Sequence, residues 1–337
     1  MTKKEAFFAL LDLFERERIR YALVGNTDEY PDHIGSDVDI VTDAEGLDRF
    51  HHAIWTLESS GLRVVQRFQH EITAFYYVLA FQMPDGGWGY LQPDICTDYY
   101  RKAIKLLDAV PMLDRRRRVD RPDSPGGGFW ALHPADEFLY YLLKKIGKKS
   151  LSSAQFRHLC DVFLLDPEAC REALSRFPII SDQVLVSVET NDETGLSTDL
   201  ADLKQSVLTS RSLPKPRRFR DAIRKIGRVF RPTGFVVVAL GKSSGQEWSP
   251  RLHAALSGAF RRQADFHAAK AGLFRKLLAA KIASTLVLLD DKPSGLSRLL
   301  VDLTPRGQDV SEVASAVLDA LSIRAKRRHG PVRKGVS

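Results

Sequence analysis

The segment Gly35-Ser36-Asp37-Val38-Asp39-Ile40-Val41 alternates two aspartates with aliphatic residues, and it follows the apolar segment Tyr21-Ala22-Leu23-Val24-Gly25-Asn26. Alternate residues of a strand share a face, so we expect Asp37 and Asp39 to point the same way. Two carboxylates on one face repel each other unless a cation lies between them or one is protonated. The pattern is typical of a magnesium site acting on phosphate oxygens, and a strand end with two solvated aspartates is the alternative.

A third carboxylate follows in an apolar context, in Gly89-Tyr90-Leu91-Gln92-Pro93-Asp94-Ile95-Cys96. We expect one strand over residues 88–96, joined to a strand at 73–82 by hairpin chemistry in Met83-Pro84-Asp85-Gly86-Gly87. If Asp94 lies beside the first two aspartates, three carboxylates converge. Such a set can hold two metal ions that bridge a triphosphate and an attacking hydroxyl.

Small and polar residues near the aspartates suit phosphate binding. Gly25 leaves room for the backbone to approach phosphates closely. Asn26 and Ser36 supply donors for phosphate oxygens. We therefore expect all three to belong to a nucleotide-binding site.

These features together resemble the DNA polymerase beta-type nucleotidyltransferase superfamily. Its pattern is an apolar strand ending in Gly-Gly or Gly-Ser, then Asp-apolar-Asp, then one acidic residue on a later strand. The resemblance covers roughly residues 5–150. It implies that Asp37, Asp39 and Asp94 are catalytic residues that bind metal. Two Mg²⁺ ions are expected, with Mn²⁺ as an alternative metal. It also implies that Asp94 helps to activate the nucleophile. Asn26 departs from the pattern, since Gly or Ser is usual there.

Cations follow the aspartates at two places. Residues 97–102 predict the start of a helix, and its Arg101 and Lys102 either neutralise substrate charge or are solvated. A strongly apolar helix from Pro134 carries Lys144 and Lys145 at its end. In related nucleotidyltransferases a lysine on such a helix contacts nucleotide phosphate, so the resemblance implies either lysine as a nucleotide ligand. Favourable placement of cations at a helix C-terminus is the alternative.

The 337-residue chain has a net charge of +8, but this charge is divided unevenly. Residues 1–210 hold 24 Lys and Arg against 33 Asp and Glu, and residues 211–337 hold 26 against 9. A basic half of this kind attracts nucleic acid, anionic lipid or phosphorylated ligands. We do not favour nucleic acid as a partner, because the basic residues match no known RNA-binding pattern.

The most basic stretch is a linker. Residues 211–231 carry nine cations and one acid, and Phe219, Ile223, Ile226 and Phe230 fall on one helical face. This predicts a basic amphipathic helix. Its apolar stripe either makes peripheral contact with a membrane surface or docks on the protein, and docking is the commoner case for such a helix.

The last part of the chain resembles a thymidylate kinase-like P-loop domain. A buried-strand run, residues 235–240, leads into a Gly-containing loop and a helix. In register from Gly241, however, the Gly-Lys-Ser/Thr end of the P-loop is replaced by Gln246, Glu247 and Trp248. The resemblance therefore implies a degenerate, truncated domain without kinase activity.

The predicted fold class is α/β: a nucleotidyltransferase fold with a mixed sheet, a helical subdomain and a C-terminal kinase-like α/β domain. The expected units are a nucleotidyltransferase core at 1–130, a helical subdomain at 131–212, a basic linker helix at 213–232, a degenerate P-loop domain at 233–323 and a basic tail at 324–337.

The predicted activity is magnesium-dependent transfer of a nucleoside monophosphate from an NTP to a hydroxyl or phosphate acceptor. A small acceptor, such as a sugar phosphate or a cell-surface precursor, comes first, and tRNA or protein second. A catalytically inactive nucleotide-binding or scaffold protein is the alternative from another class. Three scattered cysteines and the absence of a signal peptide or a long apolar segment predict a cytoplasmic location.

Overall fold

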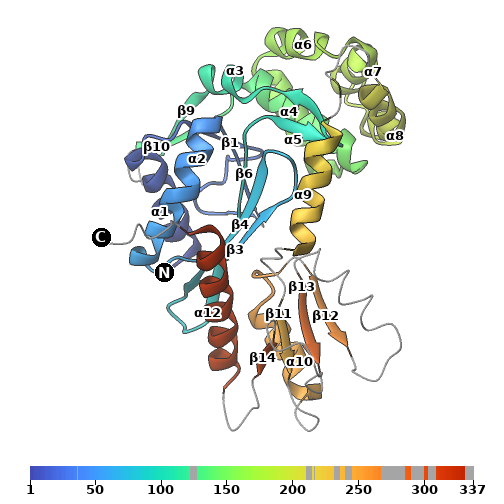
Figure 1. The fold of residues 1–337 in the computed structure, drawn as a ribbon. Coiled ribbons are helices and arrows are strands. Elements are labelled where there is room, and N and C mark those ends of the chain that lie inside the picture. Colours follow the sequence, from blue (N-terminus) through green and yellow to red (C-terminus); the bar gives the residue numbers. More distant parts are fainter. Residues whose placement is uncertain are drawn as a thin grey trace.

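The computed structural model describes residues 1–35, 37–121, 127–209, 215, 217–230, 236–239, 245–260, 262–266, 285–289, 300–302 and 309–330. These residues form a mixed α/β structure with a large mixed sheet, a group of helices beside it and a smaller parallel sheet (Figure 1). The predicted α/β class with a mixed sheet and a helical region is confirmed.

The large sheet has the strand order β3-β4-β6-β2-β1-β10-β9, with β5 added on β4. The strands are β1 (Tyr21–Val24), β2 (Val38–Thr42), β3 (Arg63–Gln69), β4 (Ala74–Gln82), β5 (Trp88–Leu91), β6 (Pro93–Cys96), β9 (Arg117–Asp120) and β10 (Gly128–Ala131). Its centre is mixed, because β2 runs antiparallel to β1 but parallel to β6. The parallel pair β2–β6 brings together two strands that are far apart in the chain.

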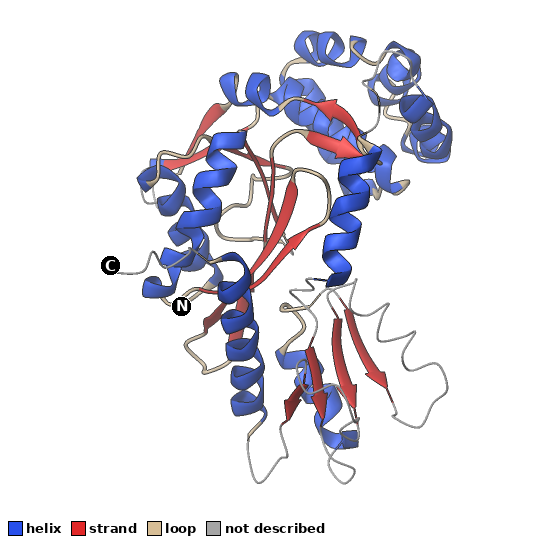
Figure 2. Ribbon diagram, viewed as in Figure 1, coloured by secondary structure: helices blue, strands red, loops and turns tan. Residues whose placement is uncertain are grey.

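Helices cover both faces of this sheet (Figure 2). One face packs on α1 (Lys3–Arg16), α2 (Ala44–Ala53) and the 3₁₀ helix η1 (Ile54–Ser60). The other face packs on α3 (Ala109–Asp114) and α4 (Pro134–Lys148). Side chains cap the N-termini of two of these helices. Thr2 and Glu5 form a capping box on α1. Asp43 caps α2 by accepting a hydrogen bond from Gly46 N at 2.7 Å.

The stretch predicted as a helical subdomain is helical. After α4 it contains α5 (Ser153–Leu165), α6 (Pro167–Ser175), α7 (Pro178–Glu189) and α8 (Glu193–Thr209). Their apolar side chains join the core on the α4 side of the sheet. Proline at the first turn of α4, α6 and α7 is compatible with each helix because the N–H it lacks has no partner within the helix there.

Two local predictions are wrong. Residues 97–102 do not begin a helix: Tyr99–Arg101 is strand β7, paired with β8 (Ile104–Leu107) through a turn whose Lys102 and Ala103 have positive φ. The single strand expected at 88–96 is two strands, β5 and β6. The β7–β8 turn is local, but its two residues with positive φ are Lys102 and Ala103, so no glycine marks it in the sequence. The break at Gln92 comes just before β6, which pairs with β2, a strand distant in sequence that local periodicity does not reveal.

The hairpin between β4 and β5 is confirmed. Gly86 N donates to Met83 O at 3.0 Å, and Met83 N donates to Gly87 O at 2.8 Å. Gly86 has φ +84, a conformation that favours glycine.

The C-terminal region contains a four-stranded parallel sheet of order β12-β13-β11-β14. Its strands are β11 (Val236–Ala239), β12 (Arg262–Phe266), β13 (Thr285–Leu289) and β14 (Leu300–Asp302), and its helix α10 spans Gly245–Ala255. Residues 240–244, which contain the start of the predicted P-loop at Gly241, lie outside the described residues. The strand before this loop and the helix after it are both present, as predicted.

The last helix, α12 (Val310–His329), packs on the first sheet (Figure 1). Its Val317 and Leu321 join Val65 and Val78 of β3 and β4 in one buried cluster. The helix continues through His329, six residues into the segment predicted as a basic tail. Within the described part of the chain, no helix is long and apolar enough to cross a membrane.

Candidate active site

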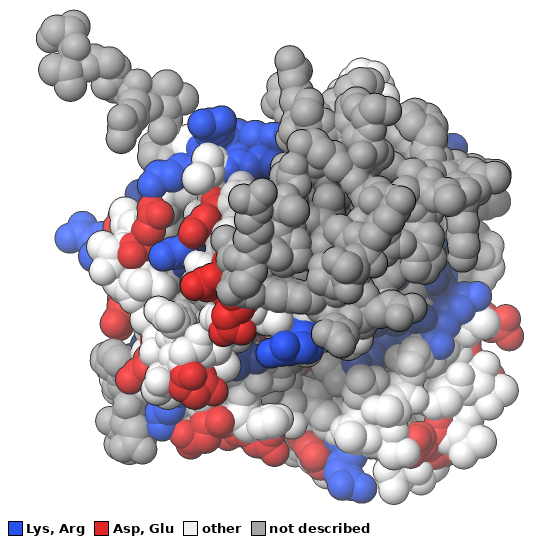
Figure 3. Space-filling view, turned by 90° about the horizontal axis from the view of Figure 1, so that it is seen from below, with Lys and Arg blue, Asp and Glu red and all other residues white. Residues whose placement is uncertain are grey.

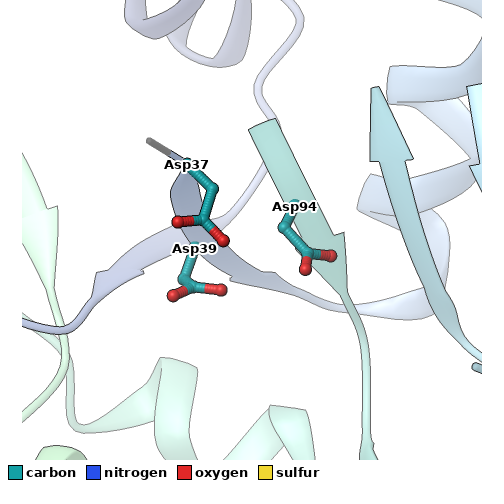
Figure 4. Close-up of side chains that lie close together, drawn as sticks. All are labelled: Asp37, Asp39 and Asp94. Carbon is teal, nitrogen blue, oxygen red and sulfur yellow. The ribbon is translucent and has the colours of Figure 1, made fainter. Parts of the chain in front are cut away.

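Three carboxylates meet at the centre of the large sheet, as the sequence predicts. Asp39 on β2 is paired with Asp94 on β6 in the parallel register, and Asp37 immediately precedes β2. Figure 4 shows the three carboxyl groups pointing into the same space from these two strands. Ligand oxygens of Asp37, Asp39 and Asp94 all lie within 4.8 Å of one another.

The strand periodicity that places these carboxylates also fixes their backbone. Val38 and Ile40 alternate with the aspartates and are buried on the opposite face, in the cluster that α1 covers. Ile95, beside Asp94, is buried in the same cluster. Because apolar residues anchor both strands from behind, the spacing between the carboxylates is set by the sheet.

One cation already contacts this set. Lys144 Nζ, on α4, donates to Asp39 Oδ2 in an ion pair whose two side chains are each 19% exposed. Burial opposes the charge on Lys144, but Asp39, Asp37 and Asp94 outweigh it and raise the pKa of Lys144 above its usual value. The predicted lysine is therefore a fully charged neighbour of the carboxylates.

The carboxylates line a cavity of about 180 Å³ beneath α4. On its other walls are His70 and Glu71 from the β3–β4 loop, Tyr99 and Arg101 from β7, and Lys148 at the end of α4. His70 Nε2 lies 3.5 Å from Asp94 Oδ1. Burial is the main cause that raises the pKa of the Glu71 carboxyl. The cavity thus has both acidic and basic groups on its walls.

The donor set fits a divalent metal ion. Mg²⁺ takes oxygen ligands at about 2.0–2.1 Å, which places two ligands of one ion roughly 3–4 Å apart. The separation of the three carboxylates is close to this range. At an effective dielectric constant of 20, two unit charges this far apart repel by roughly 3–4 kcal/mol, so the cluster favours a cation. The Lys144 ammonium shows that the same carboxylates attract positive charge in this structure.

The expected phosphate-binding residues have partners within the protein. Gly25 has φ +96, which favours glycine, and its N–H donates to Glu137 Oε1 at 2.8 Å. His158 Nε2 lies 3.3 Å from the same carboxylate oxygen. Asn26 Oδ1 accepts from Asp28 N at 3.1 Å and so stabilises the turn after β1. Ser36 lies outside the described residues.

The two lysines predicted as nucleotide ligands have different environments. Lys144 lines the cavity beside the carboxylates, whereas Lys145 is buried and its Nζ lies 4.6 Å from the centre of the Tyr141 ring. Burial, together with Lys148 and Lys144, lowers the pKa of Lys145 to about 8. The helical rotation of about 100° per residue is the reason that neighbours in sequence occupy different sites.

Sequence reasoning missed His70, Glu71 and Glu137. A signal for Glu137 exists: Glu137, Lys144 and Lys148 recur at helical spacing and form a polar stripe on an otherwise buried helix. No local pattern marks His70 and Glu71, because the β3–β4 loop reaches Asp94 only through the pairing of β4 with β6.

No protein-family model matches the sequence, and no curated protein is detectably similar to it. Several solved structures are similar. One is an antigenic nucleotidyltransferase-like protein from Paracoccidioides brasiliensis, with 15% identity and a TM-score of 0.36, covering 56% of this chain and 91% of that one. A second is a Thermotoga maritima protein named as a candidate nucleotidyltransferase, with 20% identity and a TM-score of 0.28, covering 44% and 90%.

A third is the antibiotic-resistance factor ANT(2'')-Ia, with 10% identity and a TM-score of 0.34, covering 56% of this chain and 96% of that one. None of the three is named as a kinase.

Proposed function

We propose that this protein is a magnesium-dependent nucleotidyltransferase that moves a nucleoside monophosphate from an NTP to an acceptor hydroxyl or phosphate and releases pyrophosphate. The observation that carries the proposal is the register of Asp39 with Asp94 across the parallel pair β2–β6, with Asp37 beside them. Without a metal ion, repulsion among three clustered carboxylates destabilises the folded protein. The cluster therefore favours a role in binding a cation.

Asp37, Asp39 and Asp94 would hold the metal. When bound, divalent metal supplies charge stabilisation for the triphosphate and lowers the pKa of an attacking hydroxyl. The protein's own contribution is positioning, which is the main requirement of phosphoryl-type transfer. Asp94 takes up the proton as the acceptor oxygen forms its bond to the α-phosphorus and the bond to pyrophosphate breaks.

His70 and the cavity lysines have supporting roles in this proposal. His70, 3.5 Å from Asp94, orients the carboxylate that receives the proton. With a divalent ion held by the carboxylates, Lys144 would be available to pair with the triphosphate instead of Asp39. The Gly25 N–H binds a phosphate oxygen after the Glu137 carboxylate withdraws. Asn26 and Ser36 flank that position in the sequence, and we keep them, with Lys145, as secondary candidates.

The direct test is label transfer. The purified protein is incubated with each α-labelled NTP, Mg²⁺ and a cell extract, and labelled products are separated by size and charge. We expect wild type to label a product that Asp37→Ala/Asp39→Ala does not. The matched control is Asp12→Ala/Asp48→Ala, which removes two exposed helical carboxylates and leaves labelling intact.

The product also identifies the acceptor class. A labelled small molecule agrees with our first expectation, a sugar phosphate or cell-surface precursor, and labelled RNA or protein with the second. If the wild-type protein and the double-aspartate variant give the same products with every NTP, the enzymatic proposal is wrong.

A catalytically inactive nucleotide-binding or scaffold protein is the second candidate. It is favoured by one observation, the occupation of the Gly25 N–H by Glu137. Calorimetry separates the two: tight binding of Mg-NTP that Asp37→Asn abolishes supports the enzyme, and absence of nucleotide binding supports the scaffold. In both candidate functions, we propose that the C-terminal parallel sheet is a degenerate kinase-like module without a catalytic role.

A further inference from the structure

Helix α9 (Arg218–Phe230) exposes its apolar side to solvent. Phe219 is 78% exposed, Ile223 54% and Ile226 57%. Their spacing of four and three residues places them in one stripe along the helix. An amphipathic helix on a globular protein normally buries this stripe, so the exposed orientation in α9 requires an explanation.

The opposite side of α9 holds the helix to the protein. Arg224 Nη1 donates to the backbone oxygens of Gln69, at 3.4 Å, and His70, at 2.5 Å. Asp221 Oδ1 accepts from the same guanidinium at 2.5 and 3.0 Å, which fixes its orientation. Because the polar side is attached to the β3–β4 loop, the apolar stripe must face outward.

The N-terminal end of the helix is attached as well. Arg217 N donates to Ala103 O at 2.8 Å, and the Arg217 guanidinium lies 5.6 Å from the centre of the Tyr100 ring. The helix is therefore held at two places, in the β7–β8 turn and in the β3–β4 loop. Its orientation is a property of the folded protein.

Cations flank the apolar stripe. Residues 215–230 contain seven Lys and Arg and one Asp, and the exposed ones include Arg218, Arg220 and Lys225. Lys102, in the β7–β8 turn, lies next to Ala103, whose carbonyl accepts from Arg217 N at the start of the helix. Seen from below, Lys and Arg gather in a band on this face of the molecule (Figure 3).

We propose that α9 is an interfacial helix that binds the surface of an anionic lipid bilayer. An exposed apolar stripe between two rows of cations matches the boundary between acyl chains and acidic headgroups. Nucleic acid would use the cations but leave Phe219, Ile223 and Ile226 in water. The two attachment points keep the stripe presented, so binding does not require the protein to unfold.

The proposal is independent of nucleotide transfer and is tested separately from it. The full chain is sedimented with vesicles of phosphatidylcholine alone and with vesicles of equal parts phosphatidylcholine and phosphatidylglycerol. We expect binding to the anionic vesicles only. Ile223→Ser should weaken it about tenfold through lost apolar burial, and Arg220→Gln about fivefold through lost attraction.

Matched controls come from the helical subdomain. Ile179 on α7 is 53% exposed, so Ile179→Ser makes the same change at the same exposure without altering α9. Arg157→Gln on α5 is the control for charge. Both controls should bind anionic vesicles like wild type.

Three results would overturn the proposal. The first is no sedimentation with anionic vesicles. The second is vesicle binding that is equally weakened by the α7 and α9 isoleucine variants. The third is a use of this surface other than vesicle binding: self-association of the wild-type chain that Ile223→Ser abolishes, or tight oligonucleotide binding that only Arg220→Gln loses, in either case without vesicle binding. Circular dichroism of each variant confirms that the fold is retained.

Discussion

Lys144 donates to Asp39 across 105 residues of sequence, so an ammonium group contacts a carboxylate that would ligate a metal ion. The two cations compete for the same oxygen. In the metal-free protein the lysine lowers the repulsion among the carboxylates, and on metal binding it becomes available for another anion. This relationship makes the site testable without knowledge of the substrate.

Replacing Lys144 should strengthen metal binding. We expect Lys144→Met to raise the affinity for Mg²⁺ or Mn²⁺, without nucleotide, by about tenfold, because the competing positive charge is removed. The same change should weaken binding of Mg-NTP, since the lysine no longer pairs with phosphate. Isothermal titration measures both, and Lys149→Met, exposed just after the same helix and not among the residues that line the cavity, is the control. A weaker metal affinity in Lys144→Met would contradict the model of competition.

Asp94→Asn should stabilise the metal-free protein and remove its response to metal. Relief of repulsion is expected to raise the free energy of unfolding in EDTA by about 1 kcal/mol. Wild type should gain about 2.7 kcal/mol when Mg²⁺ is present at a hundred times its dissociation constant, and the variant far less. Thermal unfolding with and without Mg²⁺ checks both parts. Asp48→Asn, an exposed change on α2, should behave like wild type.

Glu137→Gln should increase the affinity for nucleotide. The Glu137 carboxylate accepts from Gly25 N at 2.8 Å, where a phosphate oxygen would bind, and its charge repels phosphate. Glutamine has the same shape without the charge, so we expect binding of Mg-NTP to tighten about fivefold. Glu168→Gln on the exposed side of α6 is the control. If Glu137→Gln instead abolishes binding, the carboxylate contributes to the nucleotide site directly.

Lys145→Met should stabilise the protein, with a defined pH dependence. Burial, with Lys148 and Lys144, lowers the pKa of Lys145 to about 8 in the folded protein, from about 10.4 when unfolded. Between pH 8 and pH 10.4 Lys145 is protonated in the unfolded chain but mostly neutral in the folded protein, so the stability of the wild type rises with pH in this range. Below pH 8 Lys145 is charged in both states, and the folded protein bears the full cost of burying that charge.

The gain from Lys145→Met is therefore largest at pH 7 and below, about 3 kcal/mol, and declines as the pH rises through 8 toward 10.4. Urea unfolding at pH 7 and pH 10 measures it. Lys149→Met, exposed at the end of the helix, should show no such gain. An equal gain at both pH values would mean that packing of the methionine, and not the charge, is responsible.

The carboxylate set could be predicted because its information is local. Alternation of Asp37 and Asp39 with Val38 fixes which face each side chain takes, and the resemblance to a family pattern adds Asp94. The contact of His70 with Asp94 has no local signature, since it needs β4 to pair with β6. The error at residues 97–102 has a different cause: the turn that pairs β7 with β8 places Lys102 and Ala103 at positive φ, and neither is a glycine that would mark a turn in the sequence.

The linker helix shows a different limit of sequence reasoning. Periodicity predicts the amphipathic character of α9 correctly, because it depends only on spacing. Which side faces the protein depends on the Arg224 contacts with the β3–β4 loop, a tertiary arrangement that no helical pattern contains. The sequence favours docking of the apolar stripe on the protein over contact with a membrane, and this preference is wrong: Phe219, Ile223 and Ile226 are exposed.

The packing of α12 on β3 and β4 has a consequence for synthesis. Val65, Val78 and Ala80 are covered by residues of α10 and α12 that the ribosome adds more than 150 positions later. Until then the nascent first sheet presents an apolar surface, which is a target for chaperones and a hazard for aggregation. Residues 1–212 expressed alone should therefore be poorly soluble, and co-expression of a separate segment containing α10 and α12 should rescue them.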